Sequence, residues 1–204
     1  MKSSTKPFSQ ACENNRKPIL SVLQRVFNNC HHVLEIGSGS GQHAVFFAAK
    51  LQQLCWQTSD LPINHTGINL WIDDYPQDNL RRPLALDVDQ EHWPDGSDGG
   101  FDAVFSANTL HIMSWQQVKQ LFRRLKTVIK CNALVAIYGP FNYSGQYTSE
   151  SNRRFDAGLK SQHPAMAIRD IEQVNQLAHD NGFKLLEDYA MPANNRLVVW
   201  QFSL

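Results

Sequence analysis

The sequence predicts an α/β fold in which a seven-stranded, mostly parallel sheet with one antiparallel strand carries helices on both faces. Short apolar segments typical of strands alternate with longer segments whose apolar residues have helical spacing, which is the pattern of crossover connections between parallel strands. The last two strand segments are joined by a turn without a helix, so one of them is expected to run against the others. The length of 204 residues suits one domain, 1–204, that buries roughly 70% of its unfolded surface.

The elements of the N-terminal half follow from apolar spacing and from the positions of glycine and proline. Residues 8–27 carry apolar side chains at helical spacing, and Pro18 is expected near a helix start, where proline is tolerated. The glycine-rich segment 37–41 ends a short apolar run and precedes a second helical pattern. In chain order the expected elements are helix 8–27, strand 33–36, helix 42–54, strand 55–59, helix 63–75 and strand 83–86.

The elements of the C-terminal half are bounded by clearer start and stop signals. Ser114 is followed three residues later by Gln117, as in a capping box, and Gly182 lies just past the end of the last helical pattern. Proline and glycine in 91–100 indicate a loop, and 191–195 is a turn. The expected elements are strand 102–107, helix 114–129, strand 133–138, helix 169–181 and the strands 183–189 and 197–202.

A long insertion, 141–168, separates the fifth predicted strand from the last helix. Connections of this length in compact domains are usually functional or contain a helix of their own. We expect the insertion and the N-terminal helix, 8–28, to cover the side of the sheet on which a substrate binds. Arg169 and Asp170 are expected to start the last helix, with Arg169 paired to an acid.

Charge and composition exclude several classes of function. Lys+Arg and Asp+Glu are both 19, and the pI is about 7.1, which argues against nucleic-acid binding and against a polybasic membrane surface. No apolar run has the length of a membrane span, and the polar segment 1–6 lacks a signal-peptide pattern, so we expect a cytoplasmic protein. The four cysteines are far apart, and the adjacent His31 and His32 fit entry into a strand better than a shared metal site, so no metal is expected.

The segment Glu35–Gly41 is the most informative motif of the chain. A predicted buried strand runs into the spacing G-x-G-x-G, in which glycine allows a sharp turn and lets a ligand approach the backbone. A dinucleotide-binding loop needs glycine where this chain has Gln42, and the Gly-Lys-Ser/Thr of a P-loop is missing. An acidic residue two positions before this glycine spacing is the arrangement of S-adenosylmethionine (SAM) sites. The sequence therefore predicts SAM binding.

Two further acids favour the same ligand. Asp60 ends the second predicted strand, where a carboxylate can accept both ribose hydroxyls, and Asp87 ends the third, where class I methyltransferases commonly place an acid near the adenine amino group. Each acid alone fits a solvated strand end or a helix N-cap equally well, but their order at consecutive strand ends favours SAM. The candidate SAM-binding residues are Glu35, Gly37, Ser38, Gly39, Gly41, His43, Asp60, Leu61, Asp87, Val88 and Asn108.

Further motifs extend over almost the whole chain. They are Val33-Leu34-Glu35-Ile36, Gly41-Gln42-His43-Ala44, Ser59-Asp60, Leu86-Asp87-Val88, Tyr138-Gly139-Pro140-Phe141, Thr148-Ser149-Glu150-Ser151-Asn152 and Met191-Pro192-Ala193-Asn194-Asn195. With these motifs the chain resembles an uncharacterised family of class I methyltransferase-like proteins, the methyltransferase-like twenty-six group. The resemblance implies a Rossmann-like, SAM-dependent fold and no particular acceptor. This chain has Gly37, Ser38 and Ser40 where that family more often has Ala, Ser and Thr.

Methyl transfer depends mainly on positioning and on exclusion of water, and a general base is needed only when the acceptor carries a proton. His111, after the fourth predicted strand, and Tyr138, at the end of the fifth, are candidate catalytic residues, although each fits a packing role equally well. Glu150 in the insertion is a third candidate, suited to a cationic acceptor, whereas Arg16 suits an anionic one. The candidate substrate-binding residues are Glu13, Asn15, Arg16, Asn152 and Asn194.

These observations predict an enzyme that transfers a methyl group from SAM to a small molecule and releases S-adenosylhomocysteine (SAH). Asn108 is not followed by Pro-Pro-aromatic, the signature of adenine and glutamine N-methyltransferases, and this favours a small-molecule acceptor. A non-catalytic SAM-binding or partner-binding protein of the same fold is the alternative, and Gln42 disfavours a nicotinamide-dependent oxidoreductase. The acceptor and the oligomeric state are left open.

Overall fold

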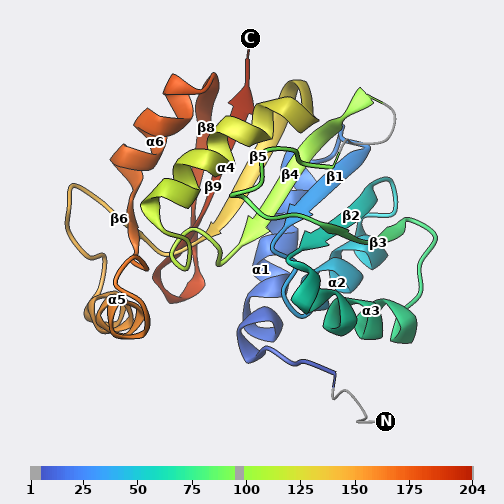
Figure 1. Cartoon of the computed structure of the whole chain (residues 1–204), viewed down its shortest axis with the longest axis horizontal. Coiled ribbons are helices and arrows are strands. Elements are labelled where there is room, and N and C mark those ends of the chain that lie inside the picture. The colour runs from blue at the N-terminus through green and yellow to red at the C-terminus, as the bar shows by residue number, and fades with distance from the viewer. Residues whose placement is uncertain (1–5, 95–98, 204) are drawn as a thin grey trace.

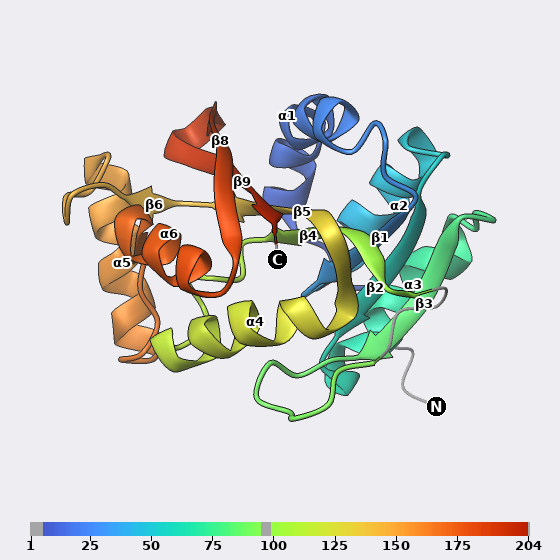
Figure 2. The same cartoon turned by 90° about the horizontal axis from the view of Figure 1, so that it is seen from above.

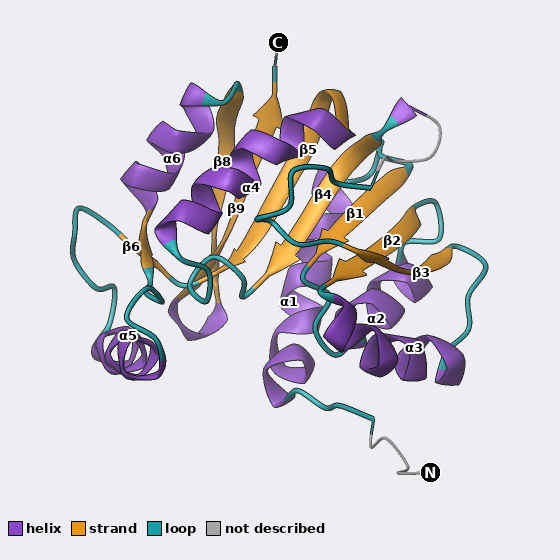
Figure 3. Ribbon diagram, in the orientation of Figure 1, coloured by secondary structure: helices purple, strands orange, loops and turns teal. Residues whose placement is uncertain are grey.

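A seven-stranded sheet lies at the centre of the structure, and helices pack on both of its faces (Figure 1, Figure 3). This computed structural model describes residues 6–94 and 99–203. The strand order is β3-β2-β1-β4-β5-β9-β8, and β9 is antiparallel to both of its neighbours while the other pairs are parallel. The predicted fold class is therefore confirmed, and the antiparallel strand is the last one.

The strands and helices have bounds close to the predicted ones. The central sheet consists of β1 (His32–Ile36), β2 (Cys55–Asp60), β3 (Leu80–Ala85), β4 (Phe101–Ala107), β5 (Ile129–Gly139), β8 (Phe183–Met191) and β9 (Asn195–Phe202). The helices are α1 (Gln10–Val26), α2 (Gln42–Lys50), α3 (His65–Asp74), α4 (Trp115–Val128), α5 (Glu150–Gln162) and α6 (Ile171–Asp180). The short elements are η1 (Pro62–Asn64), β6 (Phe141–Asn142), β7 (Arg169–Asp170) and η3 (Pro192–Asn194).

Two hydrophobic cores separate the sheet from its helical layers. Helices α1, α2 and α3 pack on one face, and α4 and α6 pack on the other (Figure 2). Successive side chains of a strand point to opposite faces, so Phe105 of β4 packs against Phe47 of α2 while Val104 belongs to the core beneath α4. Central strands are thus apolar on both sides, which is why uninterrupted apolar runs predicted them.

The ends of the helices follow the capping rules, with one difference at Pro18. The Ser114 hydroxyl accepts from the Gln117 N–H at 3.2 Å and the Gln117 side chain accepts from the Ser114 N–H at 2.8 Å, a complete capping box that starts α4. Helix α1 is capped by Ser9, so Pro18 lies in the interior of the helix. The expectation that Pro18 lies near a helix start is wrong, and one carbonyl of the preceding turn lacks its helical donor.

The insertion 141–168 contains α5 and returns to the sheet through the β6–β7 pair. Arg169 and Asp170 form β7, and α6 begins one residue later, so the expectation that Arg169 starts this helix is wrong. Within the described residues Arg169 pairs with no acid either, because its guanidinium donates to backbone carbonyls. These carbonyls belong to Leu110, Met113 and Ala165. Arg169 thereby joins the insertion to the segment that follows β4.

Two predicted segments fall partly outside the described residues: the polar N-terminus, at 1–5, and the loop 91–100, at 95–98. At the start of this loop Trp93 is buried, and its indole N–H donates to the Asp87 carbonyl at 3.1 Å. Every helix in the described ranges is too short or too polar to cross a membrane.

Candidate functional site

A cavity of about 380 Å³ lies at the carboxyl edge of the sheet, beside the glycine-rich turn after β1. We call it the glycine-loop cavity. Ligands of open α/β sheets bind at this edge because the strand ends leave a crevice there. The structure brings many of the predicted SAM-binding residues to its wall: Gly37, Gly39, Asp60, Leu61, Asp87, Val88 and Asn108.

Two glycines shape the turn after β1 for different reasons. Gly37 and Gly39 have φ of 72° and 58°, which side chains rarely adopt. A Cβ at Gly37 would lie 2.7 Å from Cγ2 of Thr109, whereas a Cβ at Gly39 would meet no atom within 4 Å. Gly37 therefore permits packing against the segment after β4, and Gly39 leaves the backbone open toward the cavity.

Asp60 holds the glycine-rich turn in place. Its Oδ2 accepts the Gly39 N–H at 2.7 Å, and its Oδ1 accepts the Leu61 N–H and the Asn64 amide, both at 2.7 Å. A carboxylate offers about four acceptor positions. Because three are used inside the protein, Asp60 has one left for a ribose hydroxyl and not the two that the sequence suggested.

The remaining predicted SAM-binding residues lie behind the glycine-loop cavity and not on its wall. Gly41 and His43 face the neighbouring helices α3 and α1, as described below. Glu35 is buried, and its carboxylate accepts the Ser38 hydroxyl at 2.8 Å and the Trp56 indole N–H at 3.1 Å. Burial raises the pKa of Glu35 to about 7, although these two donors pull the pKa down.

The raised pKa of Glu35 predicts a specific pH dependence of stability. Between its ordinary value of 4.5 and about 7 the folded state binds more protons than the unfolded state, so the free energy of unfolding falls as the pH rises through this range. We expect the stability of wild type relative to Glu35→Gln to fall by about 3 kcal/mol between pH 4.5 and 7. Urea unfolding of both proteins at several pH values measures this difference.

The comparison with the variant is needed because other groups titrate in the same range. Burial lowers the pKa of His43 and of His111 to about 4, so these histidines reduce stability as the pH falls below 6.5. Both are present in wild type and in Glu35→Gln, and their contributions cancel in the difference. A difference that is constant from pH 4.5 to 7 would contradict the raised pKa of Glu35.

Gln42, which replaces the glycine of a dinucleotide loop, joins α1 to the glycine-rich turn. Its side-chain oxygen accepts the Ser9 N–H at 2.5 Å and the Ser40 hydroxyl at 3.0 Å, and its amide donates to the Glu13 carboxylate at 2.9 Å. One residue earlier, Gly41 has φ 89° and packs against the backbone of Ile68 in α3. The glycine at position 41 and the glutamine at position 42 are therefore explained by packing and hydrogen bonds within the protein, without contact with a ligand.

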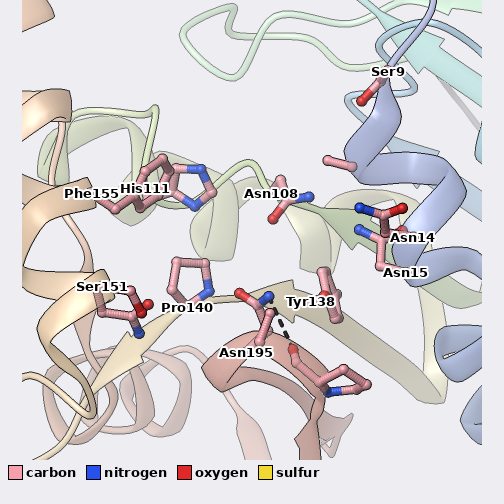
Figure 4. Close-up of a pocket in the computed structure, with 14 residues that line it drawn as sticks. Ser9, Asn14, Asn15, Asn108, His111, Tyr138, Pro140, Ser151, Phe155 and Asn195 are labelled. Carbon is pink, nitrogen blue, oxygen red and sulfur yellow. Dashed lines mark hydrogen bonds between the residues drawn. The ribbon is translucent and has the colours of Figure 1, made fainter.

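A second cavity, of about 590 Å³, lies between α1, the ends of β4 and β5, α5 and η3 (Figure 4). We call it the α1–α5 cavity. The predicted cover elements therefore both contribute to its wall, α1 through Asn15 and α5 through Asn152. Asn108, just after β4, lines this cavity and the glycine-loop cavity alike.

Asn108 is held in an unusual conformation at the junction of the two cavities. Its φ is 60°, a value that asparagine tolerates better than most residues, and its N–H donates to the Tyr138 carbonyl at 2.8 Å. Its carboxamide makes no hydrogen bond to any described residue and faces the α1–α5 cavity in Figure 4. The side chain is therefore free to contact a ligand.

His111 lines the α1–α5 cavity with its ring against Phe155 of α5, at a centroid distance of 5.3 Å (Figure 4). Only 6% of the residue is exposed, and its ring nitrogens have no hydrogen-bond partner among the described residues. Burial, and to a lesser extent the Arg169 guanidinium, lower the pKa of His111 to about 4. The imidazole is therefore neutral at pH 7 and one of its nitrogens can accept a proton.

Tyr138 and Asn15 form the wall of the α1–α5 cavity between β5 and α1. Burial raises the pKa of the Tyr138 hydroxyl, and the neighbouring Asn15 and Asn195 side chains offset part of this rise. The Asn15 Oδ1 lies 2.7 Å from Nε2 of the buried His43. Because Oδ1 only accepts, Nε2 of His43 carries the proton and the Asn15 amino group stays available. His43 thus orients a residue of the α1–α5 cavity instead of lining the glycine-loop cavity.

Four of the predicted catalytic and substrate-binding residues line neither of these cavities. Glu13 and Arg16 form an ion pair at 2.6 Å on α1, and the exposed Glu150 pairs with Arg153 at 2.6 Å on α5. Asn194 lies outside the α1–α5 cavity, and its carbonyl accepts from the Asn152 amide at 3.3 Å. The paired charges of Glu13, Arg16 and Glu150 are therefore directed at protein groups.

Other residues of the α1–α5 cavity are not among the candidate site residues selected from the sequence. They include Ser9, Asn14, Pro140, Ser151, Phe155 and Asn195. Asn195 belongs to a turn that the sequence does indicate, but no spacing connects this turn to α1 or α5. In contrast, the separation of three residues between Glu13 and Arg16, and between Glu150 and Arg153, is a visible signal for ion pairing on one helix.

In the described ranges, His, Cys, Asp and Glu side chains form no group of three that could hold a metal ion. The two cavities are lined mainly by amide, hydroxyl and apolar groups, together with the His111 imidazole of the α1–α5 cavity and the two aspartates of the glycine-loop cavity.

The chain matches one family over most of its length. The family described as "Protein of unknown function (DUF938)" matches residues 6–202.

Solved structures with the same fold include several methyltransferases. The apo form of the S-adenosylmethionine-dependent methyltransferase SibL is 20% identical, with a TM-score of 0.79, and the match covers 95% of this chain and 56% of that one. An O-methyltransferase family 2 protein from Planctomyces limnophilus in complex with apigenin has 15% identity, a TM-score of 0.80 and coverages of 94% and 57%. Human N-acetylserotonin methyltransferase in complex with SAM has 12% identity, a TM-score of 0.74 and coverages of 93% and 56%. The chain thus shares the methyltransferase fold and spans little more than half the length of these structures.

Proposed function

The chain belongs to the DUF938 family, and we propose that it binds SAM in the glycine-loop cavity and transfers the methyl group to a small molecule in the α1–α5 cavity. One observation carries this proposal: the two cavities meet at Asn108, whose side chain has no other described partner. Transfer between two bound molecules requires such adjacency. The finer kinship with the methyltransferase-like twenty-six group is supported by the motifs of the sequence alone.

The residues of the glycine-loop cavity fit SAM. The open backbone at Gly39 suits close approach by the amino-acid part, and the free acceptor position of Asp60 suits a ribose hydroxyl. Asp87 and the neighbouring Val88 offer a carboxylate and an apolar contact for the adenine. When bound there, SAM supplies a methyl group on a positively charged sulfur.

The chain's own groups orient the acceptor and receive its proton. His111 is neutral at pH 7 and has a free ring nitrogen in the α1–α5 cavity, so it is the proposed general base for an acceptor that loses a proton. Tyr138 and Asn108 are proposed to position the reacting group. Glu150 is left out of this proposal because it is exposed and paired with Arg153.

Calorimetric titration with SAM and with SAH tests the cofactor. We expect saturable binding to wild type and a loss of about 10- to 100-fold in affinity for Asp87→Ala, the value of a hydrogen bond to a charged group. Asp78→Ala is the matched control, since Asp78 is exposed and lies away from both cavities. Titration with a nicotinamide dinucleotide should show no binding.

Failure of both SAM and SAH to bind would contradict the proposal, provided that mass spectrometry of the denatured protein finds no co-purified cofactor. If SAM binds but no SAH is formed in the presence of a mixture of small molecules from cells, the result would instead favour the alternative of a non-catalytic SAM-binding protein.

A further inference from the structure

We infer that the acceptor is an uncharged polar molecule, recognised by the asparagine carboxamides around the α1–α5 cavity, and that this cavity selects against ionised molecules of the same size. The inference rests on the proposed function, because it concerns the molecule that receives the methyl group.

The described lining of the α1–α5 cavity contains no ionised side chain. Its polar groups are the carboxamides of asparagine, the hydroxyls of serine and tyrosine, and one histidine that is neutral at pH 7. The carboxamides belong to Asn14, Asn15, Asn108, Asn152 and Asn195. A cavity of this composition offers hydrogen bonds without a countercharge.

Several charged groups close in sequence to the lining are paired with other protein groups, among them Arg196 with Asp188 and Asp156 with Lys160. Arg16 pairs with Glu13, and Glu150 pairs with Arg153. Arg169 is not part of the described lining, and its Nε and Nη2 donate to three backbone carbonyls, so these N–H groups are already used inside the protein. An ionised acceptor would lose hydration without gaining a partner of opposite charge, a cost of several kcal/mol when the group is fully buried.

The carboxamides leave both donors and acceptors free. On α1, Asn14 and Asn15 use their oxygens inside the protein, with Gln10 and His43, and leave amino groups. Across the cavity, Asn195 uses its amino group on the Pro192 carbonyl and leaves its oxygen (Figure 4). Hydroxyl and amide groups donate and accept at once, so they match this arrangement. Phe155 adds an apolar wall for a flat ring.

Three probes of similar shape test the selectivity: 4-hydroxybenzamide, 4-hydroxybenzoate and tyramine, which are neutral, anionic and cationic at pH 7.5. Each is titrated calorimetrically into the protein saturated with SAH. We expect the neutral probe to bind at least about tenfold more tightly than either ion, a difference of about 1.4 kcal/mol. The anion is the critical comparison, since the Arg169 guanidinium is close enough to His111 in the cavity wall to lower its pKa.

A charge placed at the cavity should change this preference. Asn14 is exposed on the α1 side of the cavity, so Asn14→Asp should leave the fold intact. We expect it to strengthen tyramine binding about threefold and to weaken 4-hydroxybenzoate binding by a similar factor, as for a partly solvated charge pair. Gln53→Glu, the same change of amide to carboxylate at an exposed turn away from the cavity, should alter neither.

The inference is overturned if an ionised probe binds wild type as tightly as 4-hydroxybenzamide, or if the neutral probe does not bind at millimolar concentration while SAH does. If SAH itself does not bind, the proposed function fails. The same three titrations into the unliganded protein then still decide whether the cavity prefers neutral molecules.

Discussion

Replacing Gly41 by alanine is expected to lower the free energy of unfolding by about 4 kcal/mol. The left-handed backbone of Gly41, with φ 89°, costs a side chain about 1–2 kcal/mol. The new Cβ would also lie 3.1 Å from Cα and 3.3 Å from the carbonyl oxygen of Ile68, and 3.3 Å from Cβ of Trp71. Backbone and Cβ atoms of a packed helix cannot easily move aside, so this crowding adds about 1–3 kcal/mol to the loss of stability.

Gly145→Ala separates backbone strain from crowding. Gly145 has φ 70°, but a Cβ there would meet no atom within 4 Å, so this control should lose only about 1–2 kcal/mol. Thermal unfolding should show a Tm lower by about 10 °C for Gly41→Ala and by about 4 °C for Gly145→Ala. An equal loss of stability in the two variants would refute the close packing of Gly41, at the start of α2, against α3.

Replacing Asp60 by alanine is expected to weaken SAH binding about 100-fold and to reduce the free energy of unfolding by about 2 kcal/mol. The carboxylate accepts from Gly39, Leu61 and Asn64, so its loss frees the glycine-rich turn and removes the acceptor position proposed for the ribose. Calorimetry measures the affinity, and urea unfolding measures the stability.

The control for Asp60 is its partner Asn64. Asn64→Ala removes one of the three hydrogen bonds to the carboxylate and leaves the charge in the glycine-loop cavity. We expect its SAH affinity to stay within about fivefold of wild type, a change of about 1 kcal/mol, because the carboxylate remains and two of its three hydrogen bonds are kept. If Asp60→Ala remains folded and also binds SAH within that range, Asp60 does not contact the ligand.

The sequence predicted the fold well because the fold is built from repeated local patterns. Apolar runs such as 33–36 and 102–107 mark strands that are buried on both faces, and the helical patterns between them imply parallel neighbours. The turn 191–195 excluded a crossover helix and so required the antiparallel strand. Arg169 was misassigned because the two-residue strand β7 leaves no periodic signal.

The glycine-loop cavity was predictable for a related reason. Parallel strands end at the same edge, so Gly37, Asp60 and Asp87, each after a predicted strand, had to come close together. Which of all the predicted SAM-binding residues contact this cavity was not predictable. His43 lies close to the glycine-rich turn in sequence, yet its position on α2 directs its ring to Asn15 and away from this cavity.

The sequence by itself determined the order of elements, the neutral charge and the edge of the sheet at which the glycine-loop cavity lies, because these depend on periodicity and on residues near one another in the chain. Only the tertiary structure decided the α1–α5 cavity. Its walls come from Asn15, Asn108, Asn152 and Asn195, which meet because β9 inserts beside β5 and because the insertion folds back through β7. Contacts between segments so far apart depend on chain topology and side-chain packing, for which no local spacing is a signal.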